Sequence, residues 1–459
     1  MVIERTLSEF ILETKFESIP AEIVNLQKDI ILNIFGTSIA GVNAEGCESL
    51  VRQVKQWGGR KEATILIYGS MVPAHNAAFV NSVMARALDF CDAMMPGMHV
   101  GSSSVPTALA MAEFVGGLSG KEFLTALIVG TELSARINSI SIYDGFDPTG
   151  VCSIFATTAI AGRILHLNPN QMLNALALAF NRSGGSFQSN IDGSLAVRFI
   201  QGFVSQSGII CAQLAQKGIT GPKNFMEGIY GYFHLYGKDK SDKESLLDGL
   251  GKRFEMGKTL FKKYPSCGCT LSSTDAILDL LKEKAINPEK ISYIEVKVSP
   301  YCYKLVGHPF EIGENPKVNA QFSIQYCVAN ALLRRSSKLS HFDESYIKDP
   351  RIEELIKKIH VFSDQSLDDP QKSGFSISSY LKVKTQNGKV YDKMVNIPRG
   401  LPGNPLSKEE HLERFYDCLN YSRINFKKRL IEKIISTVNR LEEAKDARKL
   451  ILLLNTIKK

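Results

Sequence analysis

The chain has 459 residues, of which 44% are hydrophobic and 22% charged, so it can fill more than one core and carries an ordinary globular charge content. No apolar run approaches the roughly 20 residues of a membrane-spanning helix, and acidic residues interrupt the N-terminal apolar segment, so we expect neither a membrane nor a secreted protein. The net charge of +8 is spread along the chain, which favours a solvated surface and a small anionic ligand over a nucleic acid.

The first part of the chain carries repeated helix signals. Pro20 opens a segment with apolar residues at helical spacing, and we expect this helix to end near Gly36. Pro106 is expected to open another helix, which Gly116-Gly117 closes. These Ala-rich segments favour close helix packing, so residues 1–265 are predicted to form the first part of an all-helical domain.

Capping patterns mark further helix starts. The segments Ser119–Glu122 and Ser407–Glu410 have the spacing of capping boxes, and Asn168-Pro169 starts another helix. The basic stretch Asn425–Arg440 is expected to be a surface helix with its lysines in solvent. Residues 401–459 are therefore predicted to return to helix and to complete the helical domain.

The hydrophobic period changes after residue 265. One more helix is expected over Ser273–Glu283, and the segment Ile294–Val298 then alternates apolar and polar residues, as a half-buried strand does. Asn387-Gly388 stands between two further apolar alternations and predicts a hairpin. We predict a mainly α protein in which a smaller α/β lid domain, residues 266–400, is inserted into the large helical domain.

Motifs for cofactors and metals are missing from the sequence. No glycine-rich phosphate loop or dinucleotide fingerprint follows a strand. The nine cysteines form no disulfide framework, so they are expected to be reduced thiols of a cytoplasmic protein. Cys267 and Cys269 are the only close pair and have no histidine or second pair at zinc spacing. We therefore expect neither a cofactor nor a metal.

The most informative stretch combines acids with a histidine. Asp89 and Asp92 are expected at a helix end, and His99 follows in a loop that contains Pro96-Gly97. A loop between helix ends can gather an acid, an imidazole and free backbone N–H groups around an anion. Taken alone, the same residues could equally be a helix-end acid and a surface histidine.

These residues belong to a series of segments that resembles the MmgE/PrpD family over nearly the whole chain. The segments that carry the resemblance are Ala87–Asp92, Ser119–Glu122, Gly218–Pro222, Lys262–Cys267, Phe322–Tyr326 and Pro402–Ser407. The family includes 2-methylcitrate dehydratase, cis-aconitate decarboxylase and iminodisuccinate epimerase. The resemblance implies a helical domain with an α/β lid, a homodimer, and cofactor-free chemistry on small di- or tricarboxylates in a cleft between the domains.

The resemblance also assigns roles to individual residues. Asp89 and Asp92 match the first and last aspartates of an acidic family motif, His99 matches the histidine of the following loop, and Lys262 matches a lysine before a Tyr-Pro pair. It implies that His99, Lys262 and Asp89 are catalytic and that Asp92 binds substrate. We expect His99 and Lys262 on opposite walls of one cleft, with lysine on a substrate carboxylate and imidazole moving a proton.

Several positions depart from the family pattern. Ala93 and Met95 stand where polar residues are expected, Asp147 replaces a histidine, and Val197 replaces a lysine. Further candidates for substrate binding are Arg198, which could bind carboxylate beside Val197, then Tyr143, Asp147, Cys267 and His308.

Three functions remain open at this point. The first is a lyase that dehydrates or decarboxylates a small polycarboxylate after a proton is taken next to a carboxylate. The second is an isomerase or epimerase, which needs no acid for a leaving group and therefore tolerates lost histidines better. The third is a homologue that binds a metabolite without turnover. The residue pattern does not name the substrate.

Overall fold

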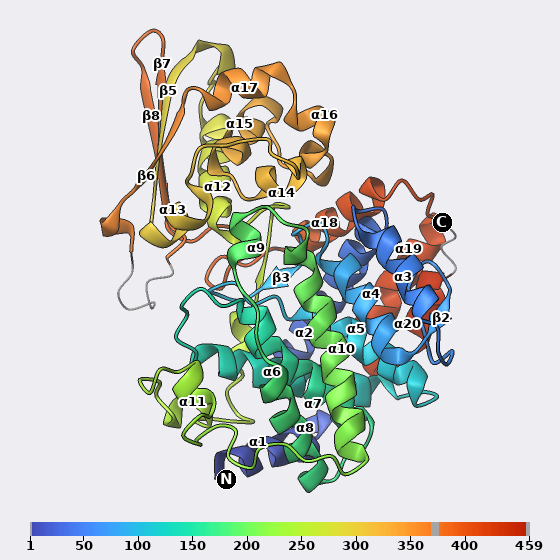
Figure 1. The fold of residues 1–459 in the computed structure, drawn as a ribbon. Helices are drawn as coiled ribbons and strands as arrows, with labels where there is room; N and C mark the ends of the chain where they lie inside the picture. The colour runs from blue at the N-terminus through green and yellow to red at the C-terminus, as the bar shows by residue number, and fades with distance from the viewer. Residues whose placement is uncertain (1, 369–375, 456–459) are drawn as a thin grey trace.

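The computed structural model describes residues 2–368 and 376–455 and is mainly helical, with a large lobe and a smaller one (Figure 1). The N-terminus lies at the end of the large lobe that is farther from the small lobe. The C-terminal helices pack on the large lobe, although the small lobe comes before them in the sequence. No helix in the described ranges is both long enough and apolar enough to cross a membrane.

Helices make up nearly all of the large lobe. The long ones in its first part are α1 (Val2–Glu13), α2 (Ala21–Gly41), α3 (Cys47–Trp57), α4 (Ala74–Arg86), α5 (Gly101–Phe114), α6 (Gly120–Ser139), α7 (Ile154–Ile164), α8 (Pro169–Arg182) and α10 (Ala196–Gln216). The short ones and those after the small lobe are α9 (Gln188–Ile191), α11 (Tyr232–Leu235), α18 (Lys408–Tyr421), α19 (Lys428–Asn439) and α20 (Lys449–Asn455). Two short antiparallel ladders accompany them, formed by β1 (Ala63–Thr64) with β2 (Met71–Val72) and by β3 (Asp92–Ala93) with β4 (Leu260–Phe261).

The small lobe is an α/β unit built on a four-stranded sheet of order β6-β5-β7-β8. The strands are β5 (Ile291–Val298), β6 (Ile359–Ser363), β7 (Ser379–Thr385) and β8 (Val390–Val395), and only the β5–β6 pair is parallel. The helices are α12 (Leu271–Glu283), α13 (Pro300–Val306), α14 (Pro316–Gln321), α15 (Ile324–Arg334), α16 (Glu344–Ile347) and α17 (Pro350–Ile356). Helix α12 packs against β7 and β8 and contacts α15.

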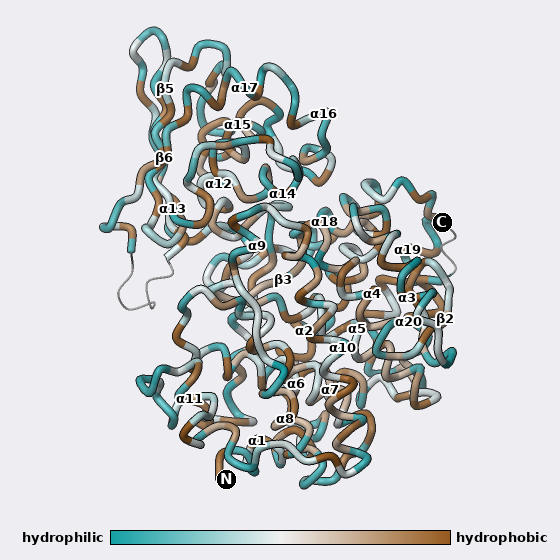
Figure 2. Tube along the Cα trace, in the orientation of Figure 1, coloured by the Kyte–Doolittle hydropathy of each residue, from teal (hydrophilic) through white to brown (hydrophobic). Residues whose placement is uncertain are grey.

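Each lobe has its own hydrophobic core. One large cluster of buried side chains joins the helices of the large lobe, and a second cluster joins the sheet and helices of the small lobe. Figure 2 shows the corresponding hydrophobic stretches along the central helices and more hydrophilic outer loops. Val197 of α10 belongs to the second cluster, so the two lobes also pack on each other.

Most of the local sequence signals are confirmed. Ser119, Asn168 and Ser407 all form capping boxes at the starts of α6, α8 and α18. Residues 291–298 form a strand, and β7 and β8 pair as the predicted hairpin around Asn387-Gly388. The basic C-terminal stretch contains α19, whose side chains Ile434 and Val438 are buried while most others face solvent.

Two predicted helix boundaries are wrong, and distant contacts explain both. Helix α2 continues past Gly36, where a Cβ atom would lie 3.0 Å from the Phe415 ring, so this glycine allows α18 to approach. Helix α5 begins at Gly101, and Pro106 lies inside it. The carboxylate of Asp92 accepts a 2.9 Å hydrogen bond from the Gly101 N–H, and thereby satisfies an amide at the helix start that has no partner within the helix.

A buried ion pair on α6 stabilises the large lobe. The Arg136 and Glu132 side chains are fully buried and lie 2.6 Å apart. The Arg136 guanidinium also donates to the carbonyls of Leu246, Asp248 and Arg253, so one side chain holds the loop that follows α11. Losing the cation would leave a carboxylate and three carbonyls without this partner in a region of low polarity.

We expect Arg136→Met to lower the free energy of unfolding by about 3–5 kcal/mol, because it leaves the Glu132 charge buried and unpaired. Urea unfolding followed by circular dichroism measures the change. The matched control is Arg52→Met. Arg52 forms an ion pair of the same i,i+4 type with Glu48, but the Arg52 and Glu48 side chains are 64% and 65% exposed. That change should cost at most about 1 kcal/mol, and equal effects of the two substitutions would contradict the prediction.

Candidate active site

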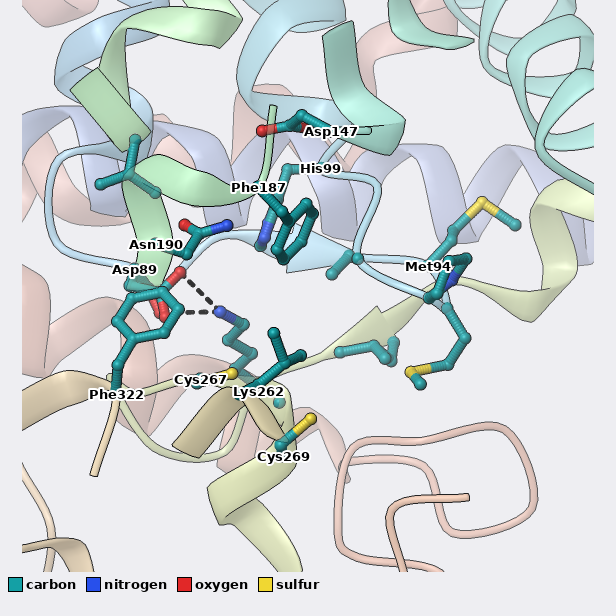
Figure 3. Close-up of a pocket in the computed structure, with 18 of the residues that line it drawn as sticks. Asp89, Met94, His99, Asp147, Phe187, Asn190, Lys262, Cys267, Cys269 and Phe322 are labelled. Carbon is teal, nitrogen blue, oxygen red and sulfur yellow. Dashed lines mark hydrogen bonds and ion pairs between the residues drawn. The ribbon is translucent and has the colours of Figure 1, made fainter. Parts of the chain in front are cut away.

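A cavity lies where the two lobes meet (Figure 3). The large lobe contributes Arg86, Asp89, His99, Asp147, Asn190 and Gln201 to its lining. The segment after β4 and the small lobe contribute Lys262, Cys267, Cys269 and Tyr301. Apolar side chains, among them those of Phe187, Val197 and Phe322, fill the spaces between these groups. The cavity therefore combines charged groups with apolar walls.

The pairing of β3 with β4 brings Lys262 beside Asp89. Asp92 and Ala93 pair with Phe261 and Leu260, so the residue after β4 lies next to the loop that precedes β3. Lys262 Nζ lies 2.7 Å from Asp89 Oδ1 and donates to the Asp89 carbonyl at 3.3 Å. Arg86, in the last turn of α4, lies 2.5 Å from the same carboxylate oxygen. Two cations and one anion are thus gathered in the cavity wall.

The charges of this cluster hold Asp89 in its ionised form. Burial alone would raise the pKa of Asp89, but the positive charges of Arg86 and Lys262 outweigh it and lower this pKa to about 2. Asp89 Oδ2 and Arg86 Nε have no hydrogen-bond partner among the described residues. With one carboxylate for two cations, the cluster keeps an excess positive charge that favours an anionic ligand.

The surroundings of His99 favour the neutral form of its imidazole. Its Nδ1 lies 2.9 Å from the Asp92 carbonyl oxygen, which fixes the proton on Nδ1 and leaves Nε2 as an acceptor. Its backbone N–H donates to Thr149 Oγ1. Burial and the nearby charges of Arg86 and Lys262 lower the pKa of His99 well below its ordinary value. In Figure 3 the ring projects into the same space as the Lys262 ammonium.

Asp92 does not line the cavity and acts on the site through its backbone and its packing. Its carbonyl orients His99, and its carboxylate binds the N–H of Gly101 and the side-chain amide of Asn33. A Cβ atom at Gly101 would lie 2.1 Å from Asp92 Oδ1, so the approach requires glycine. Burial raises the pKa of Asp92 to about 6. The structure therefore places Asp92 behind the site.

The other candidate side chains fall into two groups. Asp147 and Cys267 line the cavity, and burial raises the pKa of Asp147 to about 6. Arg198 is buried outside the lining and donates to the Glu45 carbonyl. Tyr143 packs edge to face on two cavity rings, those of Phe187 and Tyr301, without lining the cavity itself. His308 is exposed on the small lobe, away from the lining.

The departures from the family pattern also face this cavity. Ala93, Met95 and Val197 line it, so the positions where the resemblance predicts polar groups are apolar here. Val197 packs with the hydrophobic core of the small lobe. At this position, where the resemblance implies a polar group, Val197 contributes to the contact between the lobes.

Sequence reasoning missed several polar groups in the cavity. Arg86 stands three residues before Asp89 at the end of α4. This spacing is the one local signal in the sequence that could have identified Arg86. Asn190 and Gln201 come from α9 and α10, and the side-chain carbonyl oxygens of both are buried without a hydrogen-bond partner in the described ranges. Tyr301 donates to the Pro96 carbonyl at 2.5 Å and joins the small lobe to the histidine loop. Asn190 and Gln201 could bind a ligand's hydroxyl group.

The described part of the chain holds no group of three or more His, Cys, Asp or Glu side chains placed to bind a metal ion. The cavity residues themselves can perform proton transfer by His99, next to a positively charged site that can bind a carboxylate.

Comparison with known proteins gives one consistent result. A family model for the MmgE/PrpD N-terminal domain matches residues 5–245, and one for the C-terminal domain matches residues 264–440. Cis-aconitate decarboxylase of Mus musculus is 25% identical over 453 residues, which cover 94% of this chain and 89% of that protein. A cis-aconitate decarboxylase-like protein of Aspergillus oryzae is 22% identical and covers 98% of this chain and 96% of its own. 2-Methylcitrate dehydratase of Escherichia coli (strain K12) is 21% identical over 397 residues, which cover 80% of this chain and 79% of that protein.

We expect His99 to be neutral at pH 6.5, with its proton on Nδ1, because burial and two cations disfavour imidazolium. Nitrogen NMR of the protein labelled at its histidines measures the tautomer and the charge, and the His99→Gln variant assigns the signal. A His99 signal that is half protonated at pH 6.5, like an ordinary exposed histidine, would contradict this picture.

Proposed function

This chain belongs to the MmgE/PrpD family, and we propose that it is a cofactor-independent lyase that moves a proton next to a carboxylate of a small di- or tricarboxylate. The observation that carries the proposal is that His99 and the Arg86–Lys262 cation pair line one cavity. The names of the relatives, a cis-aconitate decarboxylase and a 2-methylcitrate dehydratase, support a substrate of this class.

In the proposed reaction the two cations bind the substrate carboxylate. A carbon acid beside a carboxylate is very weak, and its conjugate base places extra charge on the carboxylate oxygens. Lys262 and Arg86 stabilise that charge, while His99 Nε2 takes the proton from the carbon. Asp89 holds both cations in place through its ion pairs of 2.7 Å and 2.5 Å. Asn190 and Gln201 would orient the remaining polar groups of the substrate.

An isomerase or epimerase is the second candidate. The observation that favours it is the apolar character of Ala93 and Val197 in the lining, because loss of a leaving group needs an acid at a defined place. Epimerisation needs only removal of a proton and its return on the other face. A homologue that binds without turnover remains the outcome that the test below would reveal.

We also propose that the protein is a homodimer. Large apolar side chains are exposed on α3 and α10, two helices of the large lobe that both pack on α4, namely Trp57 on α3 with Phe203 and Leu214 on α10, at 53%, 51% and 42% exposure. A partner subunit that covers them would remove this apolar surface from water.

The class of reaction can be tested with di- and tricarboxylic acids in heavy water, observed by proton NMR. We expect at least one acid, with cis-aconitate and 2-methylcitrate in the panel, to exchange a carbon-bound proton for deuterium. Loss of water or carbon dioxide along with exchange supports the lyase, and exchange with inversion alone supports the isomerase. No exchange on any acid would contradict both enzymatic proposals.

With the di- or tricarboxylic acid that reacts as the substrate, His99→Gln should lower kcat by about 100- to 10,000-fold with little change in KM, because the proton acceptor is lost. Lys262→Met should damage both constants, since the lysine binds the carboxylate in the ground state and in the transition state. His341→Gln and Lys317→Met are the controls, a buried histidine and an ion-paired lysine outside the lining. Normal turnover of His99→Gln would overturn the assignment of the base.

Light scattering at micromolar concentration should give about twice the chain mass of 50.8 kDa. Phe203→Glu should shift the protein toward a monomer, because a charge would be buried at the proposed interface. A 50.8 kDa particle for the unchanged protein would contradict the dimer.

A further inference from the structure

The thiol of Cys267 occupies a place that distinguishes it from the other cysteines of the chain. Of the nine cysteines, all within the described ranges, Cys267 is the one that is only partly buried. It directly precedes a short 3₁₀ helix (Gly268–Thr270) and lines the cavity that contains His99 and Lys262. Cys269 also lines this cavity but is buried, so Cys267 is the more accessible of the two thiols in the lining.

The backbone around Cys267 is fixed by hydrogen bonds. Its N–H donates to the Gln321 carbonyl at 2.9 Å, and its carbonyl accepts from both the N–H and the hydroxyl of Thr270. The Gln321 side-chain amide donates to the carbonyls of Leu88 and Pro265, at 2.6 Å and 3.0 Å. Gln321 thus ties the segment of Cys267 to the loop of Asp89, and the thiol has a defined position relative to the charged cluster.

The surroundings of Cys267 make its thiol a stronger acid than an ordinary cysteine. The Cys269 thiol donates a hydrogen bond to the Cys267 sulfur, and this bond is the largest influence on its pKa. Burial opposes the effect, while the charge of Lys262 adds to it, and the pKa of Cys267 is lowered overall. Cys269 shows the reverse shift, to a raised pKa, so it acts as the donor of the pair.

Cys267 and His99 approach the cavity from different sides. His99 comes from the loop before α5 in the large lobe, and Cys267 from the segment that leads into α12 of the small lobe. In the view of Figure 3 the two side chains lie above and below the Lys262 ammonium. Because the two groups come from different lobes, a substrate whose carboxylate is bound by Lys262 would have an imidazole toward the large lobe and a thiol toward the small lobe.

We propose that Cys267 is a second proton-transfer group, which donates a proton to the substrate on the side opposite to His99. The proposal rests on the proposed function, since it adds a donor to the same reaction. It covers the return of a proton to carbon in an isomerase and the protonation of a leaving hydroxyl in a dehydratase.

The protons balance in this scheme. His99 Nε2 takes a proton from carbon and becomes imidazolium, and the electron pair of the C–H bond moves toward the carboxylate. The Cys267 S–H bond then breaks. In an isomerase its proton goes to the same carbon; in a dehydratase it goes to the hydroxyl oxygen as the C–O bond breaks, a C=C bond forms from the electron pair and water leaves. Either step leaves a thiolate. The imidazolium, whose pKa is lowered, passes its proton through solvent to the thiolate, and the neutral pair is restored.

The first arm of the test measures the thiol itself. The rate of alkylation by iodoacetamide, followed by mass spectrometry from pH 6 to 10, should show one fast thiol with a midpoint below that of an ordinary cysteine. Cys267→Ala should remove this fast reaction, and Cys269→Ala should move its midpoint upward because the hydrogen-bond donor is lost. Cys211→Ala removes a buried thiol on α10 outside the cavity lining, and it should leave the fast reaction and its midpoint unchanged. An unreactive Cys267, or one with an ordinary midpoint, would overturn the proposal.

The second arm separates proton removal from proton delivery. In heavy water, with the acid of the panel that reacts, Cys267→Ala should retain deuterium exchange within about tenfold while product formation falls by about 100- to 10,000-fold. His99→Gln should lose both deuterium exchange and product formation. A structural role for Cys267 would lower exchange and product formation together, and that result, or unchanged product formation, would overturn the proposal. If the unchanged protein reacts with no acid of the panel, the proposed function itself has failed and this inference fails with it.

Discussion

The ion cluster of Asp89 with Arg86 and Lys262 is the interaction on which the rest of the site depends. All three side chains are almost completely buried, and a buried charge is tolerated only when it is paired. The three residues come from the end of α4, the loop after it and the segment after β4, so pairing fixes those segments relative to one another. The cations are consequently in place before a ligand arrives, which is the condition under which electrostatic stabilisation is effective.

The histidine loop is organised by main-chain contacts that follow from this arrangement. Asp92 stands in β3, opposite Phe261, and its carbonyl therefore faces His99 while its carboxylate reaches Gly101 at the start of α5. Arg414 of α18 donates to the Phe90 carbonyl in the same loop, so a helix more than 300 residues away in sequence supports the position of the imidazole. The C-terminal helices thereby contribute to the site without lining it.

The sequence predicts those features that are decided by neighbouring residues. Capping boxes at Ser119 and Ser407 and the hairpin at Asn387-Gly388 need only local chemistry, and they are where they were expected. The ends of α2 and α5 depend on Phe415 and Asp92, which no local pattern reveals. Asp89, His99 and Lys262 are candidates because they stand in segments that resemble motifs of a family, and the structure places all three in the lining of one cavity. Asn190 and Gln201 could not be found from the sequence, since only the packing of α9 and α10 brings them to the cavity.

Asp147 shows how a changed residue can still suit an anionic ligand. A carboxylate in the cavity would repel the substrate if it were always charged, but burial raises the pKa of Asp147 to about 6, so its charge is lost just below neutral pH. A bound carboxylate would raise this pKa further, because like charges disfavour each other's ionised form. The protonated acid can then donate a hydrogen bond to the ligand. The cavity thus presents two cations with one fixed anion, and its second carboxyl group adapts to the ligand.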